Sequence, residues 1–220
     1  MRLQGYETLV FDCDGVVLDS NAVKTRAFHR AALPWGEAAA NALVAHHVAN
    51  GGISRYEKMR HFLAEIVPEL ATAQDGPGLD ALLQAFSTAV REELSKVPVA
   101  EGLEALRDAT ADARWLIVSG GDEAELREAF AERGLDRCFD GGIFGSPTRK
   151  DVILSRELER GNISGPAVYL GDSKFDYECA RAAGLEFIFV SGWSEVRDWR
   201  PFVAQHGIES IEKLSDLLPH

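Results

Sequence analysis

Short apolar runs and amphipathic stretches alternate along much of this chain. Apolar runs of about four residues are typical of strands buried on both faces of a sheet. Such runs cover residues 8–11, 115–118, 167–170 and 187–190, and a further short strand is predicted within 138–144. After Pro98 these runs are separated by amphipathic stretches, which predict helices over 102–113, 123–133, 151–160 and 175–183. This order of strands and helices is typical of a parallel sheet covered by helices.

The segment between the first strand and Pro98 has a different pattern, and no strand signal interrupts it. Helical patterns are predicted over 22–33, 38–49, 55–66 and 79–94, with breakers at 51–52 and 75–78. We therefore predict an α/β fold in which an α-helical cap is inserted into a Rossmann-like core with a parallel sheet. The core takes residues 1–18 and 99–220, and the cap takes residues 19–98.

Polar residues follow the first, second and fourth of the predicted strands. They are Asp12 and Asp14, Ser119 with Gly120 and Gly121, and Asp172 with Asp176. Asp12 and Asp14 on their own are also compatible with a simple turn. Because ligands bind at the carboxyl ends of parallel strands, we expect all three groups at one edge of the sheet. Several buried carboxylates need a cation, and oxygen ligands favour Mg²⁺.

Composition narrows the class of protein. The chain has 220 residues, of which 46% are hydrophobic, and a formal net charge of −12. This argues against nucleic-acid binding, which requires a basic patch. Cys13, Cys138 and Cys179 lack the spacing of a disulfide framework or a zinc site. With no apolar leader and no apolar run near 18 residues, we expect a cytoplasmic protein that does not enter a membrane.

The strand-end motifs, taken in order, resemble those of the haloacid dehalogenase superfamily over nearly the whole chain. Asp12 to Val16 is similar to the first motif, Ser119 to the second, Lys150 to the third, and Gly171 to Asp176 to the fourth. The position of the helical insert is similar to that of members with a C1-type cap. One departure is Asp151, where family members often have proline after the lysine. Arg149 is therefore an alternative to Lys150.

The resemblance implies a role for each motif residue. Asp12 is expected to be the nucleophile, and Asp14 the general acid and base. Asp172 is expected to hold Mg²⁺ with the Asp12 carboxylate and the Asp14 backbone carbonyl, with Asp176 as an auxiliary ligand. Lys150 is expected to neutralise charge on the nucleophile and the phosphate. Ser119 and the amides of Gly120 and Gly121 are expected to bind the phosphoryl oxygens.

The cap offers candidate substrate contacts. The stretch from Gly52 to Arg55 resembles the specificity loop of beta-phosphoglucomutase-like members, in which the arginine contacts a distal anionic group; Arg55 is otherwise a surface residue. Asn21 and Lys24 follow the first motif and either face the site or lie on a solvated face. His46 and His47 are interpreted as part of a helix face rather than as ligands.

These features favour a Mg²⁺-dependent phosphatase acting on a small phosphorylated metabolite, such as a sugar, sugar-acid or glycolate phosphate. The resemblance covers both phosphoglycolate phosphatases and beta-phosphoglucomutases, so a phosphosugar mutase stays an alternative, as does a capped binding protein without turnover. A dehalogenase or phosphonate hydrolase is disfavoured because neither needs Asp14 as an acid and base. The sequence leaves open whether the protein is a monomer or a homodimer.

Overall fold

A six-stranded, wholly parallel sheet forms the centre of the protein, in the order β3-β2-β1-β4-β5-β6. The structure is a computed structural model that describes residues 3–218. The strands are β1 (Thr8–Phe11), β2 (Arg114–Asp122), β3 (Gly142–Ser146), β4 (Ala167–Gly171), β5 (Glu186–Val190) and β6 (Glu209–Ile211). β1 lies at the centre, where Val10 is in register with Leu116 of β2 and Tyr169 of β4. Its position places Asp12 between the ends of the neighbouring strands.

Successive side chains of the strands point to opposite faces of the sheet, and each face has its own apolar cluster. Leu9 and Phe11 belong to one cluster and Val10 to the other. Helices α8 (Lys150–Glu159) and α9 (Lys174–Ala182) cover the Val10 face. Helices α6 (Leu103–Ala109) and α7 (Glu123–Glu132) cover the opposite face. The sheet is thus buried on both sides, as the continuous apolar runs predicted.

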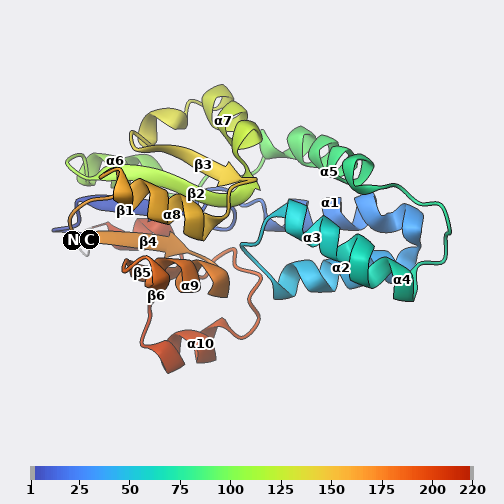
Figure 1. Cartoon of the computed structure of the whole chain (residues 1–220). Helices are drawn as coiled ribbons and strands as arrows, with labels where there is room; N and C mark the ends of the chain where they lie inside the picture. The colour runs from blue at the N-terminus through green and yellow to red at the C-terminus, as the bar shows by residue number, and fades with distance from the viewer. Residues whose placement is uncertain (1–2, 219–220) are drawn as a thin grey trace.

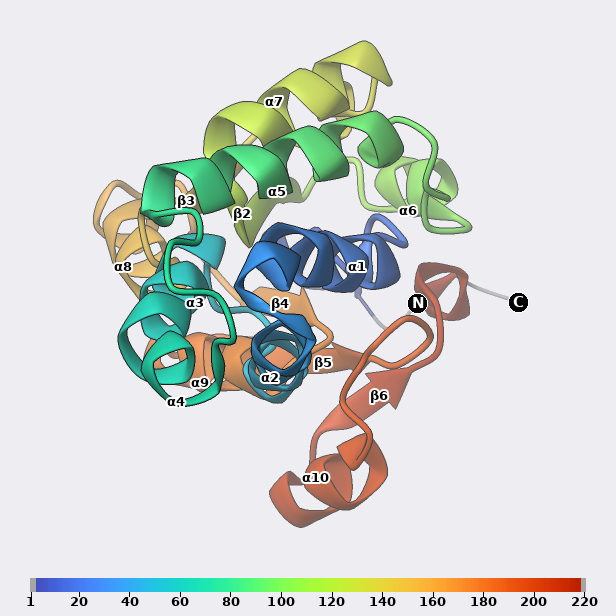
Figure 2. The same cartoon turned by 90° about the vertical axis from the view of Figure 1, so that its right-hand side faces the viewer.

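A helical insert between β1 and β2 lies beside the sheet as a separate bundle (Figure 1). Its helices are α1 (Asn21–Ala32), α2 (Glu37–Ala49), α3 (Arg55–His61), α4 (Val67–Leu70) and α5 (Leu79–Leu94). A β-bridge between Leu18 and Val99 joins the two chain segments that enter and leave the insert. Figure 2 shows α5 of the insert running beside α7 of the core. The predicted fold class is confirmed.

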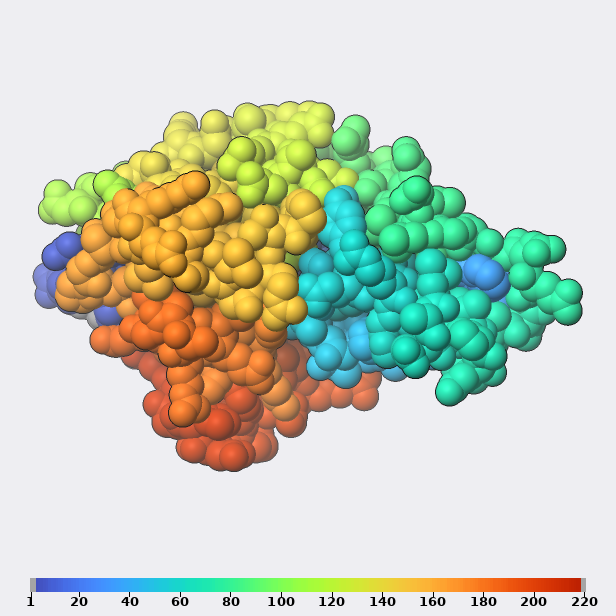
Figure 3. Space-filling model, viewed as in Figure 1, coloured from blue at the N-terminus to red at the C-terminus, as the bar shows by residue number. Residues whose placement is uncertain are grey.

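The insert packs tightly on the core. Apolar residues of the insert, such as Phe28 and Phe86, belong to the same cluster as Leu9 and Phe11 of the sheet. In the space-filling view the insert and core are in contact along their shared boundary (Figure 3). The exact division at 1–18, 19–98 and 99–220 stays a prediction, and residues 1–2 and 219–220 lie outside the described part. Within residues 3–218, no helix has the length and apolarity needed to cross a membrane.

Most predicted helices are present within one or two residues of their expected ends, but the helix predicted over 55–66 is interrupted. It consists of α3, a π-helical turn at Phe62–Ile66, and α4. Pro68 lies in the first turn of α4 and has no N–H to continue the α-helical hydrogen bonds. The π turn accommodates this loss, as single π turns inside helices do.

The strand predictions need three corrections. β2 runs on to Asp122, with an irregular register between Val118 and Asp122, so the second motif lies within the strand. β3 begins only at Gly142, because Asp136–Cys138 forms a 3₁₀ turn. β6 and the preceding helix α10 (Trp199–His206) were not predicted. β6 has only three residues, two of them exposed, so it has no strand pattern to detect.

Candidate active site

The end of β1 places Asp12 in a buried position beside Lys150. The Asp12 side chain is 3% exposed, and its Oδ1 lies 2.9 Å from the Lys150 Nζ. Lys150, the third-motif residue, is the first residue of α8, and its side chain reaches Asp12 at the sheet edge. Burial disfavours its charge, but Asp12 and Asp176 outweigh this effect and raise the pKa of Lys150 well above its ordinary value. Lys150 therefore stays an ammonium ion, whereas Arg149 is half exposed and pairs with Asp151 and Glu57.

Asp176 positions Lys150 instead of pointing freely into the site. Its Oδ1 accepts hydrogen bonds from the Lys150 Nζ at 2.5 Å and from the Tyr169 hydroxyl at 3.2 Å. Its Oδ2 accepts from the Ser173 backbone amide and hydroxyl, in the capping box that begins α9. Both oxygens of this fully buried carboxylate are therefore already engaged.

Asp172 follows β4 and lies beside the first motif. Its Oδ2 accepts a hydrogen bond of 2.8 Å from the Asn21 side chain, which also donates to the Trp193 carbonyl. Gly15 has a φ of 78°, and a Cβ at this residue would lie 2.1 Å from the Asp172 Oδ2. Only glycine therefore fits between these groups, which explains the glycine of the first motif in physical terms.

The carboxylates fit a divalent cation. Ligand oxygens of Asp12, Asp172 and Asp176 can all lie within 4.8 Å of one another. Burial, followed by the effect of neighbouring carboxylates, raises the pKa of Asp12 to about 7 and that of Asp172 well above its ordinary value. Four carboxylates, including Asp14, lie together here, and the ammonium groups that pair with them among the described residues are those of Lys24 and Lys150. The excess of negative charge and the all-oxygen donor set suit Mg²⁺.

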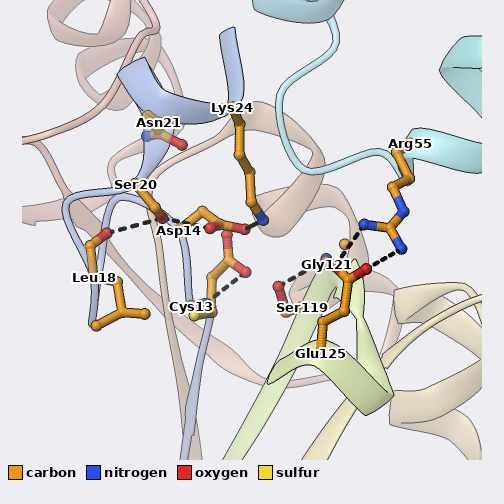
Figure 4. Close-up of polar contacts among 12 residues, drawn as sticks. Cys13, Asp14, Leu18, Ser20, Asn21, Lys24, Arg55, Ser119, Gly121 and Glu125 are labelled. Atoms are coloured by element: carbon orange, nitrogen blue, oxygen red, sulfur yellow. Dashed lines mark hydrogen bonds and ion pairs between the residues drawn. The ribbon is translucent and has the colours of Figure 1, made fainter. Parts of the chain in front are cut away.

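Asp14 is turned toward the insert, away from Lys150. Its Oδ1 accepts a 2.5 Å hydrogen bond from Ser20, and its Oδ2 forms an ion pair with Lys24 of α1 (Figure 4). Burial opposes its ionisation, but the ammonium of Lys24 and the hydrogen bonds outweigh burial and lower the pKa of Asp14. In this arrangement Asp14 is an ionised carboxylate that is stabilised by Lys24 and Ser20.

The second motif brings small and polar groups to the same cavity. The Ser119 hydroxyl is buried and accepts a 3.0 Å hydrogen bond from the Gly121 amide. Gly120 and Gly121 line the cavity together with Asp12 and Asp14. A Cβ on Gly120 would lie 2.4 Å from the Gly52 carbonyl of the insert, so the glycine allows the insert to close onto the core.

Arg55 lies in the cavity wall but is held by core carboxylates. Its guanidinium forms a bidentate pair with Glu125 of α7, at 2.6 and 2.9 Å, and lies 3.4 Å from Asp122 (Figure 4). The neighbouring Tyr56 hydroxyl also donates to Asp122, at 2.7 Å. The Arg55 Nε–H is buried without a partner among the described residues. In this structure Arg55 therefore joins the insert to the core.

We expect Arg55→Met and Glu125→Gln to raise KM by similar factors, and the double variant to be no worse than either single one. The reason is that both remove the same contact between insert and core, so their effects are not additive. Steady-state kinetics of the four proteins measure this coupling. A large rise in KM for Arg55→Met, with no rise for Glu125→Gln, would show instead that Arg55 contacts the substrate.

The structure adds cavity residues that the sequence did not propose for the site. Lys58 and His47 reach the cavity from the insert, and Glu125 and Glu195 from the core. His47 lies on a helix, α2, as expected, and its side chain is buried. Lys58 lies three residues after Arg55, and this spacing places both side chains on one side of α3. The spacing was therefore the signal from which Lys58 could have been predicted as a cavity residue.

Comparisons with known proteins agree with this geometry. Residues 6–184 match the family of haloacid dehalogenase-like hydrolases. A search of curated proteins found no match. A proposed phosphoglycolate phosphatase from Lactobacillus plantarum has a TM-score of 0.72 at 18% identity, with 97% of this chain and 98% of that chain covered. CbbY from Rhodobacter sphaeroides, solved with phosphate, has a TM-score of 0.70 at 17% identity, with 96% of each chain covered.

The chain therefore belongs to the haloacid dehalogenase-like hydrolases, because the family match covers most of its length. The family named from the sequence motifs is confirmed. The solved structures are too distant in sequence to show more than the shared fold. They agree with it over almost the entire chain, the helical insert included.

Proposed function

We propose that the protein is a Mg²⁺-dependent phosphatase that hydrolyses a small phosphorylated metabolite through an aspartyl-phosphate on Asp12. The observation that supports this proposal most is the cluster of buried charged side chains at the edge of the sheet. There the Asp12 carboxylate lies 2.9 Å from Lys150 and close to Asp172, at the base of a cavity closed by the insert. A nucleophile, a fixed positive charge and a cation site in one place are what phosphoryl transfer requires.

In the first step an Asp12 oxygen attacks phosphorus, and the bond between phosphorus and the leaving oxygen breaks. Asp14 gives a proton to that oxygen. For this step Asp14 must hold a proton, which it takes up from solvent when the substrate phosphoryl group competes for Lys24, whose ammonium now pairs with the Asp14 carboxylate. In the second step Asp14 takes a proton from water, which attacks phosphorus and releases Asp12 and phosphate. Ser119 and the Gly120 amide bind the phosphoryl oxygens, and the Gly121 amide joins them when it leaves the Ser119 hydroxyl to which it now donates.

The residues that would hold Mg²⁺ are Asp12, Asp172 and the Asp14 backbone carbonyl. Asp176 is better suited to position Lys150, because both its oxygens already accept hydrogen bonds. When bound, the cation supplies positive charge to the phosphoryl oxygens and keeps Asp12 ionised. The side chain of Asn21 orients Asp172 from the start of α1.

We expect a chelator to silence phosphate release and added Mg²⁺ to restore it. Mg²⁺ is also expected to raise the melting temperature, because it binds the folded site and relieves repulsion among buried carboxylates. The rise is expected to be larger at pH 8 than at pH 5. Asp12, with a pKa of about 7, is protonated at the lower pH and must then lose its proton to bind metal. Full activity in excess chelator would contradict the metal assignment.

A phosphatase is favoured over a mutase by the position of Lys24. A mutase needs a base that accepts a proton from a sugar hydroxyl, and mutase-like relatives have histidine at this place in the helix. An ammonium ion paired with Asp14 has no site to accept a proton. Water therefore acts as the second nucleophile.

The proposal is tested by incubating the purified protein with Mg²⁺ and a panel of small phosphomonoesters and measuring phosphate release. A mutant of CbbY has been solved with xylulose-(1,5)bisphosphate, so sugar bisphosphates belong in the panel with glycolate phosphate. We expect hydrolysis of at least one member. Conversion of glucose 1-phosphate to glucose 6-phosphate without phosphate release would favour the mutase. Binding without any turnover would favour the inactive binding protein.

A further inference from the structure

Lys58 is a buried lysine in the insert that faces the active-site cavity. It lies on α3, is 2% exposed, and lines the same cavity as Asp12 and Gly121. Its Nζ lies 2.8 Å from the Nδ1 of His47 on α2 and 5.6 Å from the ring centre of Phe28. It therefore lies in the wall of the cavity that holds Asp12, and its Nζ contacts a neutral hydrogen-bond acceptor.

Lys58 differs from the other two basic residues that line this cavity among the described residues. Lys24 pairs with Asp14, and Arg55 with Glu125. The described residues offer no carboxylate within 4.0 Å of the Lys58 Nζ. Burying an ammonium ion without a counter-charge is costly, and a bound anion would remove that cost. Lys58 is therefore a basic group of the cavity that forms no ion pair with a carboxylate of residues 3–218.

His47 adds a second unused donor beside Lys58. Burial, followed by the positive charge of Lys58, lowers the pKa of His47 to about 2, so the ring is neutral. Because its Nδ1 accepts from Lys58, its Nε2 carries the hydrogen. That Nε2 is buried without a hydrogen-bond partner among the described residues, and the Glu195 carboxylate is 3.7 Å away. Both groups can donate, and both lie in the cavity wall.

We propose that Lys58 and His47 bind a second anionic group of the substrate, so that the enzyme selects short phosphomonoesters with a distal carboxylate or phosphate. This inference rests on the proposed phosphatase function. In this proposal Lys58, and not Arg55, contacts the distal anionic group of the substrate. Arg55 joins the insert to Glu125 of the core.

The selectivity is expected to depend on pH. Burial, followed by the charge of Lys24, lowers the pKa of Lys58 to about 7. Lys58 binds an anion only when protonated, so the preference is full below pH 7 and is lost as the pH rises above it. The charged and titratable groups that face Lys58 are Lys24 on α1, Asp14 after β1, His46 and His47 on α2, Glu195 in the loop after β5, and Lys150 on α8.

The test compares 2-phosphoglycolate with ethyl phosphate, which has the same length but no distal charge. In Lys58→Met the ratio of their kcat/KM values is expected to fall by about 10- to 100-fold, since a hydrogen bond to a charged group is lost. The kcat/KM value for ethyl phosphate is expected to fall by a much smaller factor than the value for 2-phosphoglycolate. Lys96→Met, at an exposed lysine after α5, is the matched control and should keep the wild-type ratio. The bisphosphate of 1,3-propanediol carries a phosphate as its distal anionic group. It tests whether the site also accepts a distal phosphate in place of a carboxylate.

The wild-type ratio is also measured from pH 5.5 to 8.5, because effects common to both substrates cancel in it. In the wild type we expect this ratio to fall as the pH rises through about 7. In Lys58→Met we expect the ratio to stay constant with pH. Calorimetric titration of both proteins with 2-phosphoglycolate gives a readout without turnover, with tighter binding expected for the wild type. Melting temperatures check that Lys58→Met folds.

The outcomes separate this inference from the proposed function. Hydrolysis of both substrates with the same ratio in wild type and Lys58→Met would overturn the anion site and leave the phosphatase intact. No hydrolysis of any substrate would overturn the phosphatase. In that case weaker calorimetric binding by Lys58→Met would still support the anion site, and equal binding would overturn it too.

Discussion

Replacing Asp12 by asparagine is expected to reduce phosphate release by roughly 10⁴-fold or more, because the amide keeps the volume of the side chain but cannot attack phosphorus. The fold is expected to survive. The neutral amide relieves repulsion among the buried carboxylates, and Lys150, which loses its pair with Asp12, keeps its pair with Asp176. Activity and the melting temperature should therefore change independently, which phosphate-release assays and thermal unfolding can measure.

The control for this variant is Asp108→Asn, at an exposed residue of α6 that lies away from the cavity. It should keep wild-type activity and a wild-type melting temperature. Turnover near the wild-type rate in Asp12→Asn would show that the nucleophile lies elsewhere. Loss of the folded state in that variant would show that Asp12 is needed for structure.

Replacing Lys150 by methionine is expected to reduce both stability and activity. The Lys150 Nζ lies 2.9 Å from Asp12 and 2.5 Å from Asp176, and all three side chains are buried. Removing one partner of a buried ion pair leaves an uncompensated charge, which costs about 3–5 kcal/mol of unfolding free energy. Loss of the positive charge at the phosphoryl group is expected to reduce kcat by about 10²- to 10³-fold. Urea unfolding and steady-state kinetics measure the two effects.

A second substitution separates these two effects. In Lys150→Met with Asp176→Asn, the carboxylate left without its partner is replaced by a neutral amide, so part of the lost stability should return. Activity should stay low, because the positive charge beside Asp12 is still absent. If the double variant recovered activity along with stability, Lys150 would have only a structural role.

The sequence predicted the parts of the site that depend on strand ends. Asp12 and Asp172 follow buried parallel strands, Ser119 lies in the last part of β2, and parallel strands bring their carboxyl ends to one edge. Lys150 could be predicted only from the resemblance, because its distance to Asp12 depends on how α8 packs on the sheet. Local patterns carry no information about such packing.

The substrate side of the cavity was harder to predict, because its contacts join residues far apart in the chain. The stretch from Gly52 to Arg55 indicated that Arg55 contacts an anionic group of the substrate. It carries no information about Glu125, seventy residues later, which accepts two hydrogen bonds from the Arg55 guanidinium. His47 was interpreted as part of a helix face, although packing of α2 against α3 buries it beside Lys58. Which polar residues are buried depends on tertiary packing and not on helical spacing.

The central claim is that hydrolysis passes through a phosphoryl group bound covalently to Asp12. The most direct test mixes the enzyme and Mg²⁺ with a ³²P-labelled substrate from the panel, quenches with acid within the first turnover, and locates the label by peptide mapping. We predict label on Asp12, formed and lost at rates that account for phosphate release, and none in Asp12→Asn. Phosphate release at the full rate with no labelled Asp12 at any time would contradict the account.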